Sequence, residues 1–229
     1  IGTISAGSPR LEFVGSLFAL TRDPRFTRIE LRPTLYLHFG REEIVRDFMG
    51  NPSWGDWLLF IDDDMQFTLA AVEKLLDVAD PDTCPIVGGV YWSPLAGCTD
   101  TSDQVFPVVF SFDPGERGSQ FADTFVHRPM PRRWVAEQTA PFSCDAIGTG
   151  FLLIHRKVFA AMTDHYPPPM HCFTMDAIAG VASGEDLNFC SRAKELGFPI
   201  VAVPLDPADI SHIKSSRVVR PTFGDPHAP

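Results

Sequence analysis

The segment Trp57-Leu58-Leu59-Phe60-Ile61-Asp62-Asp63-Asp64-Met65 decides the fold class of this chain. Its first five residues are apolar, as in a buried strand, and three adjacent carboxylates follow directly. Carboxylates packed so closely repel one another unless water or a cation neutralises them. Because hard divalent cations prefer oxygen ligands, the pattern predicts a metal site at the carboxyl edge of a sheet.

Strand and helix patterns alternate along the first 90 or so residues. Ser8 is expected to cap the first helix, with Pro9 at its first position. The alternation predicts an α/β fold with a Rossmann-like, mostly parallel sheet flanked by helices. We expect strands over 1–6, 29–38, 57–61 and 86–90, and helices over 10–21, 41–49 and 68–78.

The composition changes in the middle of the chain. Residues 92–142 are rich in Pro, Gly, Asp and Phe, with one clear strand over 105–112 and no convincing helix. This predicts a loop-rich insertion with a small second sheet, suited to substrate recognition. Regular structure is expected to return with strands over 143–154 and 200–203 and helices over 157–163 and 185–196, before an irregular tail over 215–229.

Composition limits the class of protein. With 229 residues, 45% of them hydrophobic, we expect a single domain over residues 1–229. The excess of 29 acidic over 19 basic residues argues against a broad surface for nucleic acid or anionic membranes. Five cysteines without a Cys-x-x-Cys pair fit reduced thiols. We therefore expect a cytoplasmic protein without a membrane span.

Two later segments add polar groups. Ser183-Gly184-Glu185-Asp186 opens a helix, and one interpretation is a capping box in which Ser183 caps the helix and Asp186 returns the bond. The other interpretation is catalytic. Ile210-Ser211-His212-Ile213 places an imidazole just beyond the last strand, where it would complete a metal site begun by the acid triplet.

Four features occur in a suggestive order: the acid triplet, the strand Gly148-Thr149-Gly150-Phe151-Leu152-Leu153-Ile154, the Gly-Glu-Asp helix start and the late histidine. In this order the chain resembles the nucleotide-sugar-dependent glycosyltransferases of the GT-A fold, especially an inverting family with many bacterial and phage enzymes. The resemblance covers most of the chain, from Ile1 to Lys214. It implies a nucleotide-binding half over 1–91 and an acceptor-binding half over 92–214, and host cytoplasm for a phage-encoded enzyme.

The resemblance also implies roles for individual residues. Asp62 and Asp64 match the outer acids of the family's Asp-x-Asp motif, and His212 matches its late metal-binding histidine. Mn²⁺ or Mg²⁺ would then be bound by Asp62, Asp64 and His212. The donor would be a nucleoside diphosphate sugar, with UDP- or GDP-sugars expected. The positions implied for binding the nucleotide and its phosphates are Thr3, Ser5, Ala6, Gly7, Arg41, Asp62, Asp63 and Lys214.

Sugar transfer explains why these residue types are needed. The departing diphosphate develops charge that a divalent ion stabilises as a Lewis acid. The acceptor hydroxyl must lose its proton to a carboxylate, for which Asp186 is the expected general base. Glu185 would orient the acceptor or hold a sugar hydroxyl, or the two would exchange roles. The acceptor stays open between glycan, lipid, protein and modified nucleic acid.

Candidate sugar-binding residues have both structural and functional interpretations. Gly148, Thr149 and Gly150 would either mark close packing in a strand or let a sugar approach the backbone. Asp145 is a candidate for binding sugar hydroxyls. The aromatic residues would stack on sugar faces or belong to the core: Tyr91, Trp92 and Trp134.

Two other functions remain open at this point. A metal-dependent phosphohydrolase or nucleotidyltransferase would also use an acid triplet, although two-metal sites gather further carboxylates. A non-catalytic protein that binds sugar nucleotides would keep the same fold without turnover. Release of free sugar together with nucleoside diphosphate would distinguish a glycosyltransferase from both.

Overall fold

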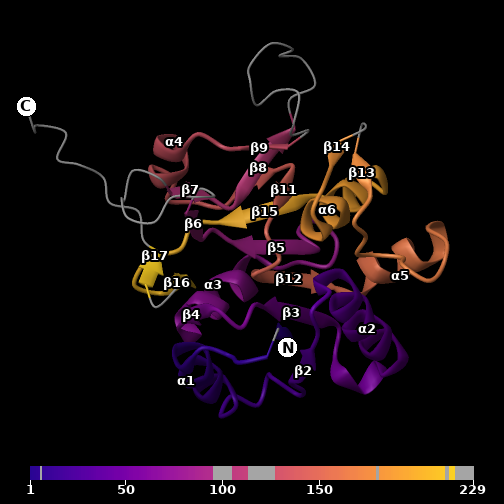
Figure 1. The fold of residues 1–229 in the computed structure, drawn as a ribbon, viewed down its shortest axis with the longest axis horizontal. Coiled ribbons are helices and arrows are strands. Elements are labelled where there is room, and N and C mark those ends of the chain that lie inside the picture. Colours follow the sequence, from indigo (N-terminus) through magenta and orange to yellow (C-terminus); the bar gives the residue numbers. More distant parts are fainter. Residues whose placement is uncertain (6, 95–104, 113–126, 179–180, 215–216, 220–229) are drawn as a thin grey trace, which may run out of the picture.

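A seven-stranded sheet forms the centre of the computed structural model, which describes residues 1–5, 7–94, 105–112, 127–178, 181–214 and 217–219 (Figure 1). β10 and β12 run against their neighbours and the other strands share one direction, which confirms the expected mostly parallel sheet. In sheet order, the strands are β10 (Phe142–Cys144), β15 (Ile200–Val203), β5 (Ile86–Gly89), β12 (Phe151–His155), β3 (Trp57–Ile61), β1 (Gly2–Ser5) and β2 (Glu30–Pro33).

Helices cover both faces of this sheet. One core cluster joins it to α2 (Leu37–Gly50), α5 (Arg156–His165) and α6 (Glu185–Glu195), which lie to the right of the sheet in Figure 1. A second cluster joins it to α1 (Leu11–Leu20) and α3 (Leu69–Val78). The sequence of β3 is apolar throughout because alternate residues enter the two core clusters on opposite faces of the sheet.

Short elements complete the fold. A three-stranded sheet consists of β11 (Ala146–Ile147), β8 (Val109–Phe112) and β9 (His127–Pro129), which confirms the expected small second sheet. Another consists of β17 (Arg217–Val219), β16 (Ile210–Lys214) and β4 (Met65–Phe67). The remaining elements are η1 (Pro52–Trp54), the pair β6 (Trp92–Pro94) and β7 (Val105–Pro107), α4 (Arg132–Ala136), and the pair β13 (Ala177–Ile178) and β14 (Val181–Ala182).

Several predicted boundaries are wrong. The strand expected over 29–38 ends at Pro33, and α2 begins at Leu37 instead of residue 41. The apolar run there misled the prediction, because Leu35 is 80% exposed and Tyr36 is 65% exposed. A Cβ on Gly40 would lie 2.5 Å from Thr34, so this glycine lets the chain turn directly from β2 into the helix.

The predicted cap of the first helix is also wrong. Arg10 occupies the N-cap position of α1 without a side-chain capping bond, and both Ser8 and Pro9 lie before the helix. The chain enters this helix through a backbone contact instead, since the Arg10 N–H donates to the Asp63 carbonyl at 3.0 Å. In the insertion, the single strand expected over 105–112 is divided between β7 and β8, and α4 is a short helix that was not predicted.

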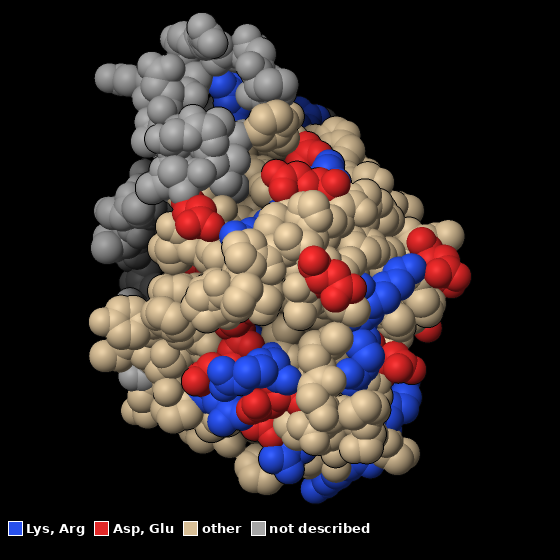
Figure 2. All heavy atoms as spheres, turned by 90° about the vertical axis from the view of Figure 1, so that its right-hand side faces the viewer, with Lys and Arg blue, Asp and Glu red and all other residues tan. Residues whose placement is uncertain are grey.

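The surface and thiols add three observations. Figure 2 shows lysines and arginines interspersed with aspartates and glutamates over the face that α2, α5 and α6 cover. Among the helices in the described ranges, none combines the length and the apolar character needed to cross a bilayer. The described cysteines at positions 84, 144, 172 and 190 are free thiols.

Candidate active site

The acid triplet forms the turn between β3 and β4, at the carboxyl edge of the parallel strands. Backbone bonds fix this turn: the Asp62 N–H donates to the Gly150 carbonyl at 3.1 Å, and the Met65 N–H donates to the Asp62 carbonyl at 3.1 Å. Each of the three carboxylates then meets a different partner. These partners offset part of the repulsion expected from the sequence, although the charges of Asp64 and Asp62 still raise the pKa of Asp63.

Asp62 is ion-paired with a buried arginine. The Nη2 group of Arg41, from α2, donates to Asp62 Oδ1 at 2.6 Å, and Nη1 of the same guanidinium donates to Glu185 Oε1. Arg41 is only 2% exposed. Burial by itself would lower the pKa of Arg41, but the carboxylates of Asp62, Glu185 and Asp186 raise it above its usual value. The arginine therefore stays charged and links the triplet to α6.

Asp63 forms a hydrogen bond with Ser5, at the end of β1. Burial raises the pKa of the Asp63 carboxyl, opposed by a hydrogen bond with Ser5 and reinforced by the charges of Asp64 and Asp62. Ser5 ends β1 and also accepts the Gly7 N–H at 3.3 Å. Asp63 thus connects the triplet to the end of the first strand, where the family resemblance implies the nucleotide.

Asp64 meets the late histidine through strand pairing. His212 lies in β16 opposite Met65 of β4, and the Ile213 N–H donates to the Asp64 carbonyl at 2.7 Å. This register places His212 Nε2 3.0 Å from Asp64 Oδ2. The imidazole is 7% exposed, and its buried Nδ1 atom has no hydrogen-bond partner.

This pair of donors fits a Mg²⁺ or Mn²⁺ ion. Two ligands at about 2.1 Å from one ion and at right angles to each other lie about 3 Å apart, close to the separation between Asp64 and His212. Within the described residues, no group of three or more His, Cys, Asp or Glu side chains converges, so the expected ligands Asp62, Asp64 and His212 do not form one cluster. Asp62 binds Arg41 instead. Mg²⁺ usually keeps several waters and binds substrate phosphates beside one or two carboxylates, so a small set of protein donors is what such a site requires.

Asp186 is a partly buried acid at the start of α6. Burial, reinforced by the charge of Glu185, raises its pKa from 3.8 to about 6, although Arg41 and the Leu187 N–H bond oppose this rise. The capping-box interpretation is wrong: Gly184 occupies the N-cap position without a side-chain bond, and Ser183 Oγ is buried without a partner. Asp186 Oδ1 instead accepts the N–H of Leu187 at 2.8 Å.

Tyr91 forms a buried support for the site that the sequence did not distinguish from core or stacking aromatics. Its ring packs edge-on against His212 with centroids 5.5 Å apart. Burial raises the pKa of Tyr91 well above 10, and the charges of Asp62 and Asp186 raise it further. The signal was the position of Tyr91 two residues after β5, where a parallel strand delivers side chains to the ligand edge.

Gly148 and Gly150 make room for this tyrosine. A Cβ on Gly148 would lie 2.4 Å from the Tyr91 hydroxyl and 2.5 Å from Val108, and a Cβ on Gly150 would lie 2.7 Å from the same hydroxyl. The structure thus supplies a packing reason for both glycines. Thr149 between them is 2% exposed.

The remaining predicted sugar-binding residues lie in different surroundings. Asp145 is ion-paired with Lys194 and accepts the Phe112 N–H at 2.6 Å, and although burial opposes the shift, these bonds lower its pKa. Trp134 is 40% exposed on α4 and packs edge-on against Phe142. Trp92 lines an apolar pocket of about 110 Å³ at the ends of β5 and β15.

The structure describes the other predicted nucleotide-binding residues only in part. Thr3 is fully buried within β1, and its hydroxyl has no partner. Ala6 lies outside the described residues. Lys214 ends β16, but its side chain is also outside the described part.

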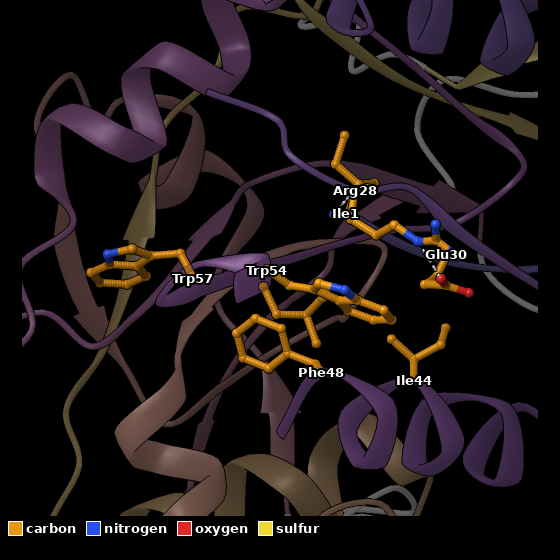
Figure 3. Close-up of a pocket in the computed structure, with 8 residues that line it drawn as sticks. Ile1, Arg28, Glu30, Ile44, Phe48, Trp54 and Trp57 are labelled. Carbon is orange, nitrogen blue, oxygen red and sulfur yellow. Dashed lines mark hydrogen bonds and ion pairs between the residues drawn. The ribbon is translucent and has the colours of Figure 1, made fainter. Parts of the chain in front are cut away.

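A separate pocket lies at the opposite, amino edge of the strands. Figure 3 shows its lining side chains, among them Trp54 and Phe48 and the ion pair between Arg28 and Glu30, which measures 2.6 Å. Its free volume is about 10 Å³, roughly what one water molecule needs. This volume is too small for a nucleotide or a sugar.

Comparison with solved structures identifies the type of fold. The crystal structure of A197 from STIV matches 96% of this chain and 91% of that chain, with a TM-score of 0.56 and 17% identity. The crystal structure of GalNAc-T7 with UDP, GalNAc and Mn²⁺ matches 92% of this chain but 37% of that chain, with a TM-score of 0.50 and 14% identity. The chain has a GT-A-like fold. No protein-family model matches it, and no curated protein sequence does.

Proposed function

We propose that this chain is a metal-dependent glycosyltransferase that transfers a sugar from a nucleoside diphosphate to an acceptor hydroxyl. One observation carries the proposal. A candidate metal pair, Asp64 and His212, and a candidate general base, Asp186, occur at the same sheet edge and are connected through Asp62, Arg41 and Glu185. The GT-A-like fold supports the same conclusion.

Asp64 and His212 would hold Mn²⁺ or Mg²⁺ together with donor phosphates and water. When bound, the ion would act as a Lewis acid that stabilises charge on the departing diphosphate. The end of β1, with Ser5 and Gly7, would lie beside the nucleotide. The described residues thus provide separate candidates for binding the leaving group and for activating the acceptor.

Asp186 would take the proton from the acceptor hydroxyl. A pKa of about 6 suits this task, because the carboxylate is ionised at pH 7.5 yet more basic than an exposed aspartate. Its partly buried position also limits competition from water. The bond formed is between acceptor oxygen and the anomeric carbon, and the bond broken is between that carbon and the diphosphate oxygen.

A ligand screen followed by product analysis tests this function. Thermal unfolding is measured with UDP, GDP and their sugars, with and without Mn²⁺, starting with UDP because the GalNAc-T7 structure holds UDP and Mn²⁺. A ligand at about 100 times its Kd should stabilise the fold by roughly 2.7 kcal/mol. Slow Mn²⁺-dependent hydrolysis of the matching donor should give free sugar and nucleoside diphosphate.

Other products would refute the proposal in distinct ways. Nucleoside monophosphate together with sugar phosphate would indicate a phosphohydrolase. Tight binding of a sugar nucleotide without hydrolysis, and without transfer to any glycan, lipid, protein or nucleic-acid acceptor, would indicate a non-catalytic binding protein.

A further inference from the structure

Arg41 connects two parts of the candidate site that are far apart in the sequence. Its Nη groups bind Asp62, 21 residues away, and Glu185, 144 residues away. The side chain is 2% exposed, whereas Arg46 on the same helix is 71% exposed. A charge buried to this extent persists only when it is paired and hydrogen-bonded, and both requirements are met by the two carboxylates.

The guanidinium geometry makes this connection specific. Arginine presents its donors in a rigid planar fork, so two carboxylates bound to different Nη atoms are held in a defined relative position. The Nε atom of Arg41 is buried without a partner. The guanidinium is 2% exposed and bound to Asp62 and Glu185, which favours a positioning role over the nucleotide contact that the family resemblance implied.

The next residue of α2, Glu42, binds the chain segment that leads to α6. Glu42 accepts the N–H groups of His171 at 2.7 Å, Cys172 at 3.1 Å and Phe173 at 2.9 Å. This segment precedes β13, β14 and the start of α6. Adjacent residues of α2 therefore hold the beginning of α6 and the chain that leads to it.

We propose that Arg41 is a positioning residue that fixes α6 relative to the acid triplet, with Glu185 as its fixed partner and not as a base. The inference rests on the proposed function, because it concerns how Asp186 is placed against the donor. Arg41 sets the distance between the donor side at Asp62 and the acceptor side at α6. It acts through these residues and does not contact the substrate.

The test compares Arg41→Lys, Glu185→Gln and their combination with the parent. Lysine keeps the charge but has a single nitrogen in place of the fork, so it cannot hold both carboxylates in the same geometry. We expect each single variant to lower kcat about 10- to 100-fold while KM for the donor changes less than about threefold. The combined variant should be no slower than about the slower single variant, because both remove one connection.

Stability provides a second measurement that needs no activity. Thermal midpoints of the same variants are measured in chelator and without nucleotide. The losses should be less than additive in the combined variant, because each single change disrupts the same ion pair. Arg46→Lys is the matched control on α2, and its exposed side chain should leave kcat, KM and the thermal midpoint close to those of the parent.

Each alternative outcome would overturn the inference. A more than tenfold weaker affinity of Arg41→Lys for the nucleotide, with kcat unchanged, would make Arg41 a nucleotide contact. Additive losses would disprove the coupling to Glu185. A parent enzyme without turnover would refute the proposed function and the positioning role with it, while the thermal cycle would still establish whether the ion pair stabilises the fold.

Discussion

Replacement of Asp186 by asparagine is expected to stabilise the fold at neutral pH and to remove most of the activity. Burial together with the charge of Glu185 raises the pKa of Asp186 from 3.8 to about 6. As the pH rises, the folded protein therefore keeps the proton on Asp186 to a higher pH than the unfolded chain does. Stability is therefore lost as the pH rises from about 4 to about 6. Above this range, a shift of about two pKa units costs roughly 3 kcal/mol of unfolding free energy.

Asparagine avoids this cost because it carries no charge. Its side-chain oxygen can still accept the Leu187 N–H, the bond that Asp186 makes now. A gain of roughly 2 to 3 kcal/mol corresponds to a rise in Tm of roughly 5 to 10 °C for a chain of this size. At pH 4.5, where nearly all of the native Asp186 is protonated while the unfolded chain is mostly ionised at this position, the gain should shrink to about a third.

The assay is thermal unfolding of the parent and Asp186→Asn at pH 4.5 and 7.5, in chelator. Asp164→Asn removes the same charge from an exposed position of α5 and serves as the matched control. Its Tm should differ little from that of the parent at either pH.

Activity completes the test of Asp186. Turnover of Asp186→Asn should fall roughly 10²- to 10⁴-fold while donor affinity stays near that of the parent. Turnover of the parent should rise as the pH passes through about 6, because the base must be ionised. A variant that is slightly less stable at both pH values and turns over normally would refute the reasoning, since Asp186 would then be no more than a local hydrogen-bond acceptor.

Two further substitutions test the metal pair and the glycine packing. His212→Ala should weaken binding of UDP about tenfold or more in Mn²⁺ but not in chelator, as measured by calorimetry, and an equal loss in both would contradict a metal role. Gly150→Ala should lower the unfolding free energy by about 2 kcal/mol, because its Cβ would lie 2.7 Å from the Tyr91 hydroxyl. Gly50→Ala, with nothing within 4 Å, is the control, and equal stability of the two variants would disprove the packing argument.

The main sheet was predictable because its strands obey strong local patterns. β3 is apolar throughout because Leu58 and Phe60 enter one core cluster while Leu59 and Ile61 enter the other. The strand predicted over 29–38 was too long because the local pattern there misrepresents burial. The apolar residues around Leu35 are exposed, so hydrophobicity there did not report burial, and Gly40 set the helix start through a contact that no periodicity records.

Part of the site depends on pairings that local sequence does not reveal. β4 has three residues, and its partner β16 lies about 145 residues later in the chain. This pairing puts His212 next to Asp64, as their order in the family had suggested, while the metal role stays a prediction. The support from Tyr91 was missed because its neighbours come from three separate segments, represented by Gly150, His212 and Asp186.

The two acids at the start of α6 show why adjacent residues need a structure to separate their roles. Glu185 is ion-paired with Arg41, so its carboxylate is engaged in holding the guanidinium. Asp186 forms no ion pair within the described residues, and burial raises its pKa toward neutrality. Although the two acids are adjacent in α6, their side chains have different partners. Glu185 orients the helix through Arg41, and Asp186 is the better candidate to accept the proton.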